Sequence, residues 1–416
     1  MSHIFPWQRV ASGANLLGDD GRLAATIFEE VTALAARTGA INLGQGYPDD
    51  DGPAFMAEAA RRAILEGRNQ YAPGAGIPEL REAVAGHQRL HYGLEPDPET
   101  EVVVSTGATE AIAAAVLAFV SPGDEVLTFE PFYDSYGATI ALAGGVHRTV
   151  PLRAPDFQPD PDRVAAAVTD RTRMIILNTP HNPTGAVFGP EVLARIVELA
   201  IRHDCIIVSD EVYEHLTFGV RHVPVASLPG AWDRTLTISS AGKTFSYTGW
   251  KIGWASGPAP LVAALRTVKQ FLSYSSGPAF QPAVAEALAL PLESFAGLAR
   301  DLETKRDLLA GGLEEAGLDV YRPAGTYFIL ADVAPLGLAD AAELARRMPA
   351  ELGVAAIPVS AFCHADGARA TRSLLRFAFC KRRDVLAEAS RRLAGIARMA
   401  DGPVPGPRRP GDGGHP

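Results

Sequence analysis

The sequence predicts an α/β protein with a mostly parallel sheet, followed by a smaller α+β unit. Between residues 100 and 256, short apolar runs alternate with stretches of helical periodicity, which is the pattern of strands joined by crossover helices. Most of these runs lack strict alternation, as expected of strands covered on both faces. From about residue 294 the pattern changes to a long helix and then mixed strands and helices, which indicates a second, smaller domain.

Individual elements can be placed from the apolar runs. We expect strands at residues 101–104, 125–129, 174–177, 205–208, 235–238 and 252–255, with helices at residues 110–119 and 191–203. In the second region we expect a long helix from about residue 294, strands at residues 327–332 and 374–379, a helix near residues 340–352 and a closing helix.

The chain has 416 residues, which is longer than the size at which a single core usually keeps growing. We divide it into four parts. These are an N-terminal arm at residues 1–45 that belongs to the small domain, a large α/β domain at residues 46–293, a small α+β domain at residues 294–400, and a disordered tail at residues 401–416, where Pro and Gly are dense.

Composition argues against several classes of partner and of structural site. A net charge of −10 argues against nucleic acid or an anionic membrane as the main partner. The cysteines Cys205, Cys363 and Cys380 are odd in number and lack metal-ligand spacing, so we expect neither a disulfide framework nor a metal site, and a reducing cytoplasm fits. The start of the chain does not resemble a signal peptide, and the apolar run at residues 111–120 is far shorter than the roughly 20 residues that span a bilayer.

Polar residues follow the predicted strands. In open α/β sheets the functional site lies beyond the carboxyl ends of the strands, so these clusters should meet at one edge. They are Thr106–Thr109, Glu130–Tyr133, Asn178–Pro183, Ser209–Tyr213 and Ser239–Lys243.

The triplet Gly242-Lys243-Thr244 could be the end of a nucleotide-binding P-loop. A P-loop requires a glycine five positions before Gly242, where this chain has Thr237 inside a predicted strand, and it requires a following helix, whereas the next segment returns to a strand. We therefore reject the P-loop. Lysine is scarce, with five in the chain, and two of them, Lys243 and Lys251, lie in this segment.

Pyridoxal phosphate chemistry needs a lysine that forms a Schiff base, an acidic partner for the pyridine nitrogen, and phosphate donors. Lys243 suits the first role, although a lone loop lysine is more often solvated. Asp210 follows a buried apolar run and would pair a protonated pyridine nitrogen, or it caps the next segment. The residues 107–109 precede an Ala-rich helix whose N-terminus favours a phosphate, and Ser240 and Lys251 could add a hydroxyl and a cation.

With Asn182–Gly185, Asp210–Tyr213 and Ser240–Lys243 in order, the chain strongly resembles the class I aminotransferases of fold type I, from about residue 23 to residue 397. The segment Asn42–Asp49 is most similar to the branch of kynurenine/glutamine transaminases, methionine aminotransferases and actinobacterial-type N-succinyldiaminopimelate aminotransferases. The resemblance implies a large domain with a mostly parallel seven-stranded sheet that binds pyridoxal 5'-phosphate, a smaller α+β domain, and a homodimer whose active sites use both chains.

The resemblance also implies roles for the cofactor site. Lys243 would hold pyridoxal phosphate covalently and later move the substrate proton, while Asp210 would keep the pyridine nitrogen protonated. Asn182 and Tyr213 would hydrogen-bond the phenolic oxygen, and Tyr133 would stack on the ring. The implied catalytic residues are thus Lys243, Asp210 and Tyr213, and the implied phosphate contacts are Gly107, Ala108, Thr109, Ser240, Lys251 and Tyr71 of a neighbouring subunit.

For the substrate, the resemblance implies contacts from Gly46, Asn182 and Arg376. The planar guanidinium of Arg376 would bind the α-carboxylate through two hydrogen bonds. The alternative for a lone arginine between apolar residues is a salt bridge on the face of a strand. Gly46 would approach the same carboxylate through its backbone, or it simply occupies a tight turn.

The implied reaction moves an amino group from an L-amino acid to a 2-oxo acid, with 2-oxoglutarate as the expected acceptor and N-succinyldiaminopimelate as the first expected donor. The alternatives are kynurenine, glutamine, methionine or aromatic donors, or a cysteine-conjugate β-lyase on the same scaffold. Where the kynurenine branch carries a bulky aromatic residue this chain has Ile27-Phe28, which weakens the case for aromatic donors. A regulator with an aminotransferase-like domain would carry an additional DNA-binding domain, and about 22 residues precede the matching region.

Overall fold

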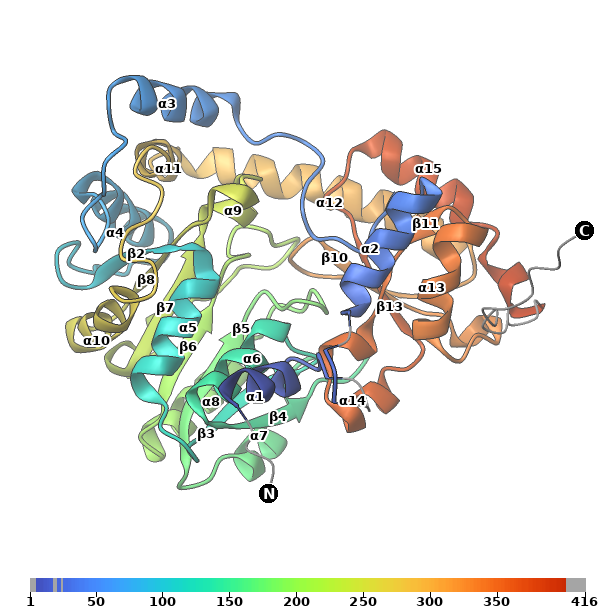
Figure 1. Cartoon of the computed structure of the whole chain (residues 1–416), viewed down its shortest axis with the longest axis horizontal. Helices are drawn as coiled ribbons and strands as arrows, with labels where there is room; N and C mark the ends of the chain where they lie inside the picture. The colour runs from blue at the N-terminus through green and yellow to red at the C-terminus, as the bar shows by residue number, and fades with distance from the viewer. Residues whose placement is uncertain (1–4, 18–20, 24, 402–416) are drawn as a thin grey trace, which may run out of the picture.

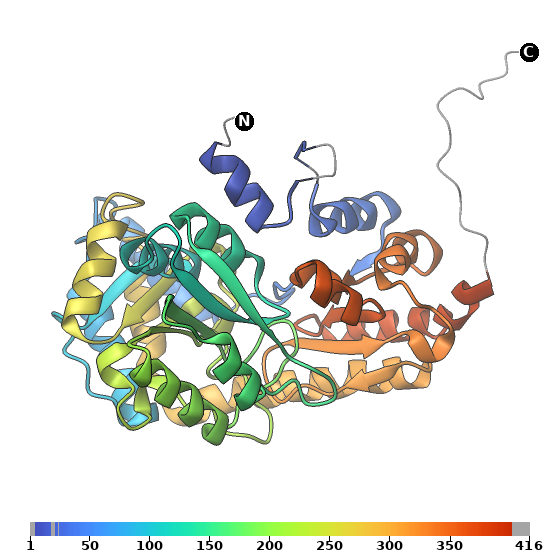
Figure 2. The ribbon, with the colours of Figure 1, turned by 90° about the horizontal axis from the view of Figure 1, so that it is seen from below.

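The computed structural model describes residues 5–17, 21–23 and 25–401. Apart from Asp401, the disordered tail expected at residues 401–416 lies outside the described residues. A large sheet with its helices and a smaller sheet with its helices lie side by side, and the long helix α12 (Leu292–Glu315) runs along both (Figures 1 and 2).

The large sheet has seven strands in the order β2-β8-β7-β6-β5-β3-β4. Strands β4, β3, β5, β6 and β7 are parallel to one another, and β8 is antiparallel to both β2 and β7. Their bounds are β2 Val102–Thr106, β3 Glu125–Glu130, β4 Val146–Pro151, β5 Thr172–Asn178, β6 Ile206–Asp210, β7 Thr235–Ser240 and β8 Ile252–Ser256. The expected mostly parallel, seven-stranded α/β sheet is confirmed.

Helices cover both faces of this sheet, which explains the continuous apolar runs of its strands. Successive residues of β5 point to opposite faces: Ile175 shares a core with Ile196 of α8 (Pro190–Arg202), and Ile176 shares a second core with Ile112 of α5 (Gly107–Phe119). Other helices on the sheet are α6 (Asp134–Ala143), α7 (Pro161–Ala167) and α10 (Ala259–Lys269) (Figure 1). The central parallel strands β5, β6 and β7 are therefore buried on both sides and end at one common edge.

The smaller unit is built on a four-stranded antiparallel sheet in the order β12-β13-β10-β9. These strands are β9 Asp319–Tyr321, β10 Phe328–Asp332, β12 Ile357–Pro358 and β13 Leu374–Ala378. Helices α12, α13 (Ala341–Glu351) and α15 (Arg383–Leu393) contribute buried apolar residues to the same core as β10 and β13. This is the expected α+β arrangement.

The N-terminal segment contacts both units. Helix α1 (Pro6–Gly13) packs on α6 beside the large sheet, whereas α2 (Ile27–Thr38) packs on α13, and β1 (Ile41–Asn42) pairs with β11 (Val354–Ala355). Thr26 begins α2 with a capping box, in which its hydroxyl accepts from the Glu29 amide and the Glu29 carboxylate accepts from the Thr26 amide. The limits of the arm and of the two domains stay predictions.

The remaining helices are α3 (Ala54–Leu65), α4 (Pro78–Tyr92), α9 (Ala241–Thr244), α11 (Gln281–Leu288) and α14 (Ala365–Ala370). In the described residues, no single helix is long and apolar enough to cross a membrane. The pair α11 and α12, bent by 95° at their junction, meets that test by length and composition only.

Candidate active site

A cavity lies at the carboxyl ends of β5, β6 and β7, the edge where the polar clusters were expected to meet. It brings together most of the predicted site residues, which come from segments far apart in the sequence. Among its lining residues are Gly107, Ala108, Thr109, Tyr133, Asn182, Asp210, Tyr213, Ser240, Lys243 and Lys251. Gly46, Arg376 and Tyr71 do not line this cavity.

Lys243 lies on α9, directly after the carboxyl end of β7. Its Nζ is 5.9 Å from the ring centroid of Tyr213 and 5.8 Å from that of Tyr327. Burial lowers the pKa of the Lys243 ammonium group, and the nearby positive charges act in the same direction. A lysine whose pKa is lowered has a larger neutral, nucleophilic fraction, so this amine is suited to covalent chemistry.

Asp210 ends strand β6 and is buried. The Tyr136 hydroxyl donates to its Oδ2 at 2.6 Å. Burial raises the pKa of Asp210 from 3.8 to about 6, although the Tyr136 hydrogen bond lowers it in part. A cation bound in the cavity against this carboxyl group would favour its charged form and reverse the shift. Asp210 is therefore arranged to pair with a positively charged ligand group.

The raised pKa of Asp210 predicts how stability depends on pH. Because its pKa is higher in the folded than in the unfolded chain, its contribution is fully present below pH 3.8 and is lost as the pH rises through about 6. Relative to Asp210→Asn, the free energy of unfolding of ligand-free wild type should fall by about 2 kcal/mol between about pH 4 and pH 7. Urea denaturation across this range checks it, and parallel curves for the two proteins would contradict it.

Two asparagines connect this carboxyl to the rest of the site. Asn178 donates through Nδ2 to the Asp210 carbonyl oxygen at 2.9 Å, and its Oδ1 accepts from the Asn182 amide at 2.8 Å. The Asn182 side chain in turn accepts at Oδ1 from Arg376 at 3.0 Å. A continuous set of hydrogen bonds therefore joins the end of β6 to a guanidinium from the smaller sheet.

Arg376 is buried on β13 between aromatic rings. Its guanidinium carbon lies 4.0 Å from the ring centroid of Phe328 and 4.6 Å from that of Phe362. Besides Asn182 it donates to the Gly44 carbonyl oxygen at 2.7 Å, and its buried Nε has no hydrogen-bond partner among the described residues. Burial lowers the pKa of Arg376 to about 10, so it stays charged at neutral pH. The unused donor and the charge suit a carboxylate ligand.

Gly46 lies against Phe328, one of the two rings that hold Arg376, and against Tyr327. A Cβ added at Gly46 would lie 2.4 Å from Cζ of Phe328, so the close approach of the backbone requires glycine. The Tyr327 hydroxyl donates to the Gly46 carbonyl oxygen at 2.7 Å and holds this segment against the start of β10. The predicted position of Gly46 near Arg376 is consistent with the contact that both make with Phe328, and the roles of both residues stay predictions.

The end of the cavity next to α5 and Lys251 carries groups that suit an anion. Helix α5 begins at Gly107, whose φ of 72° suits glycine. A Cβ there would lie 3.2 Å from Nζ of Lys251, so the Lys251 ammonium is held beside the first turn of α5. Free amides at a helix N-terminus, a cation and the Ser240 hydroxyl in one pocket favour a phosphate dianion. This end therefore fits the phosphate of pyridoxal phosphate.

Three site residues were not predicted, namely Tyr136, Asn178 and Tyr327. Asn178 had a signal, because it opens the polar cluster that follows a predicted strand. Tyr136 lies in helix α6 and Tyr327 directly before β10, where each reads as an ordinary buried aromatic residue. Only the fold shows that Tyr136 hydrogen-bonds Asp210 and that Tyr327 lies near Lys243.

Comparison with known proteins decides the family. Residues 38–393 match the family model described as aminotransferase class I and II. The chain belongs to this aminotransferase family. It is an enzyme that transfers an amino group between amino acids and 2-oxo acids, and its fold is that of the fold type I members.

Several relatives match this aminotransferase over most of their length. The "Probable N-succinyldiaminopimelate aminotransferase DapC" of Mycobacterium tuberculosis is 53% identical, covering 90% of this chain and 96% of the relative. The methionine aminotransferase of Escherichia coli is 41% identical, covering 89% and 96%. The solved structure of the M. tuberculosis N-succinyldiaminopimelate aminotransferase has a TM-score of 0.87 and covers 90% of this chain and 97% of that chain.

Proposed function

We propose that this aminotransferase uses pyridoxal 5'-phosphate to move the amino group of N-succinyl-L,L-diaminopimelate to 2-oxoglutarate. Support for the cofactor comes from one cavity that combines an amine of lowered pKa, a buried carboxyl group and an anion-binding helix N-terminus. Support for the donor comes from the 53% identity to a relative with that name.

When bound, pyridoxal phosphate supplies an electron sink that stabilises negative charge on the substrate carbon bearing the amino group. The Asp210 carboxylate would hold the ring nitrogen protonated, and Lys243 Nζ would accept and return the proton at substrate Cα. Tyr133, which burial leaves with a raised pKa and hence neutral, would pack on the ring. Arg376 would orient the α-carboxylate so that the Cα–H bond points toward Lys243.

The donor proposal also draws on α2. Phe28 lies near its N-terminus, with its ring centroid 5.8 Å from the guanidinium carbon of Arg376 and 5.2 Å from the ring centroid of Phe362. The first turn of α2 is therefore in a position to contact the substrate side chain. Ile27, in the same turn, packs on the core and offers no large aromatic surface for an aromatic donor.

Steady-state kinetics with a panel of donors tests the proposal. We expect kcat/KM for N-succinyl-L,L-diaminopimelate with 2-oxoglutarate to exceed that for kynurenine, methionine, glutamine and phenylalanine. Negligible turnover of the first with strong turnover of another would refute the donor. Pyruvate release from cysteine conjugates without any 2-oxo acid would instead support the β-lyase. The absorption band of lysine-bound cofactor tests the cofactor separately.

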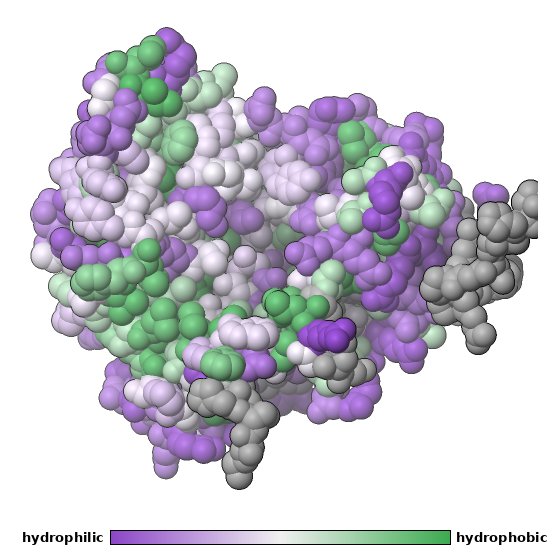
Figure 3. Space-filling view, viewed as in Figure 1, coloured by the Kyte–Doolittle hydropathy of each residue, from purple (hydrophilic) through white to green (hydrophobic). Residues whose placement is uncertain are grey.

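We also propose a homodimer in which Tyr71 contacts the cofactor phosphate of the neighbouring subunit. Tyr71 is 85% exposed and lies outside the cavity of its own chain, although the family resemblance assigns it to a phosphate. Apolar side chains gather on the face that carries α1, α3 and α5, whereas the side of the smaller sheet is mostly hydrophilic (Figure 3).

The three buried, unpaired cysteines are consistent with a reducing cytoplasm.

The dimer proposal predicts a measurable role for an exposed hydroxyl. Tyr71→Phe should weaken cofactor affinity about tenfold, because it removes one hydrogen bond to a charged phosphate. Fluorescence titration of the ligand-free protein measures the affinity, and sedimentation velocity measures the oligomeric state. A monomer, or an unchanged affinity in Tyr71→Phe, would contradict the shared site.

A further inference from the structure

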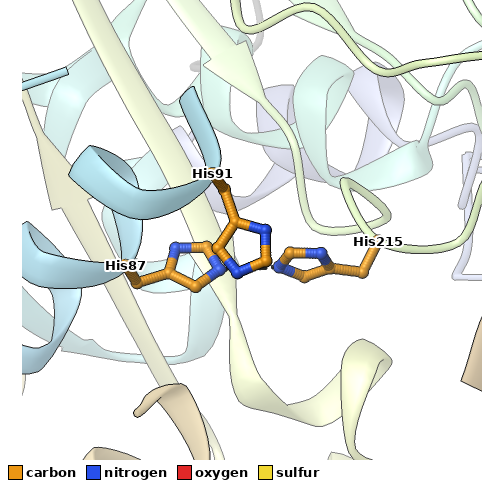
Figure 4. A group of neighbouring side chains, drawn as sticks. All are labelled: His87, His91 and His215. Carbon is orange, nitrogen blue, oxygen red and sulfur yellow. Dashed lines mark hydrogen bonds between the residues drawn. The ribbon is translucent and has the colours of Figure 1, made fainter. Parts of the chain in front are cut away.

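Three histidines form a cluster outside the active-site cavity. His87 and His91 are four residues apart on α4, so they share one face of that helix, and His215 comes from the loop after β6 (Figure 4). One nitrogen of each ring lies within 4.8 Å of the others. Two histidines at this helical spacing with a third from another segment are a common way to hold a metal ion.

The nitrogens of this cluster are incompletely satisfied by the protein. Nε2 of His87 and Nε2 of His215 face each other at 2.7 Å, a distance at which one ring donates a proton to the other. Nε2 of His91 is buried and has no hydrogen-bond partner among the described residues. If the three rings were only packed together as neutral side chains, the His87–His215 hydrogen bond would be explained. Nε2 of His91 would still be buried without a partner, at a cost of about 1–3 kcal/mol.

The surroundings of the cluster suit a bound cation. The Phe295 ring covers it, with centroids 4.3 Å from the His215 ring and 4.8 Å from the His91 ring. The carboxylate of Glu214 acts electrostatically on His91 and would partly balance a positive ion.

The cluster is also accessible. His91, Glu214 and His215 line a pocket that is open to solvent, which gives an ion a path to the rings. Two nitrogens bound to one tetrahedral zinc ion lie roughly 3.4 Å apart, since each Zn–N bond is about 2.1 Å long. The nitrogens of His87 and His215, now 2.7 Å apart, would therefore separate by about 0.7 Å, and the ion would replace the proton between them.

We propose that His87, His91 and His215 bind one divalent transition-metal ion of the kind that prefers imidazole, with Zn²⁺ as the representative. Three protein ligands leave a fourth position for water or another small donor. The ion would join α4 to the loop after β6, and that loop also contains Tyr213, which lines the active-site cavity. The ion would thus hold His215 in place, two residues along the chain from Tyr213 in the active-site cavity.

Calorimetric titration with Zn²⁺ tests the proposal. The protein is the cofactor-loaded enzyme after removal of any affinity tag, treated with a chelator and transferred to phosphate-free buffer. We expect one ion per chain and a higher melting temperature with Zn²⁺, since an ion that binds only the folded state stabilises it. His91→Ala should weaken the affinity by at least about tenfold. With Co²⁺ as a second probe, the wild type should show visible d–d absorption that the variant lacks.

Controls separate this site from other zinc-binding groups. His203→Ala removes a half-buried histidine at the end of α8 and should bind Zn²⁺ as the wild type does. Any Zn²⁺ bound by the cofactor or its phosphate would appear equally in all variants. His215→Gln provides a second disruption, and circular dichroism verifies that both variants fold. Absence of stoichiometric binding, or equal affinities in wild type, His91→Ala and His215→Gln, would overturn the proposal.

Discussion

Replacing Lys243 with alanine is expected to lower aminotransferase kcat by roughly ten-thousandfold or more and to abolish the absorption band of lysine-bound cofactor. Lys243 is the amine at the end of β7 whose pKa is lowered by burial, and its Nζ faces the cavity between Tyr213 and Tyr327. Both proposed tasks, bonding the cofactor and moving the substrate proton, need that nitrogen. Absorption spectra and single-turnover kinetics with saturating donor measure the two losses.

Lys251, eight residues later, provides a matched control. Its ammonium lies beside Gly107 at the N-terminus of α5, so Lys251→Ala should weaken cofactor affinity and still form the lysine-bound band at saturating cofactor. A small primary amine added to Lys243→Ala should restore part of the activity, because it can replace the missing nitrogen in the space left. A Lys243→Ala enzyme that keeps the band, or that turns over like wild type, would remove Lys243 from the reaction.

Strands buried on both faces were predictable, and the partly exposed edge strand β4 was not. The runs that became β5 and β6 are continuous in apolar residues because helices cover both faces, so local composition reveals them. Strand β4, at residues 146–151, lies at the edge of the sheet and alternates exposed and partly buried residues, including His147 and Arg148. Its pairing with β3 depends on tertiary structure and left no apolar run to recognise.

The residues of the site likewise divide into those that the sequence could predict and those that it could not. Residues directly after buried strands, such as Asp210 and Asn182, were predicted because parallel strands end at a common edge. Tyr136 could not be predicted, because its hydrogen bond to Asp210 joins a helix to a strand end far away in the sequence. The histidine cluster is similar, since the spacing of His87 and His91 is visible in the sequence but the approach of His215 is not.

Replacing Arg376 with alanine is expected to reduce kcat/KM for the amino donor by roughly 30- to 5000-fold, which corresponds to the loss of about 2–5 kcal/mol for a buried, hydrogen-bonded charge pair. The charge is held between Phe328 and Phe362, and its Nε is the donor left without a partner. Arg376→Lys keeps the charge but loses the planar fork, so we expect only partial recovery of kcat/KM.

The cofactor band distinguishes substrate binding from general damage. Arg376 does not line the cofactor cavity, so both variants should form lysine-bound cofactor, whereas their affinity for dicarboxylate inhibitors should fall in parallel with kcat/KM. Arg346→Ala is the matched control, because Arg346 pairs with Glu30 on the surface of the same unit and should leave the kinetics unchanged. If Arg376→Ala lost the band along with its activity, the arginine would act by holding Asn182 and the end of β6 in place rather than by binding the carboxylate.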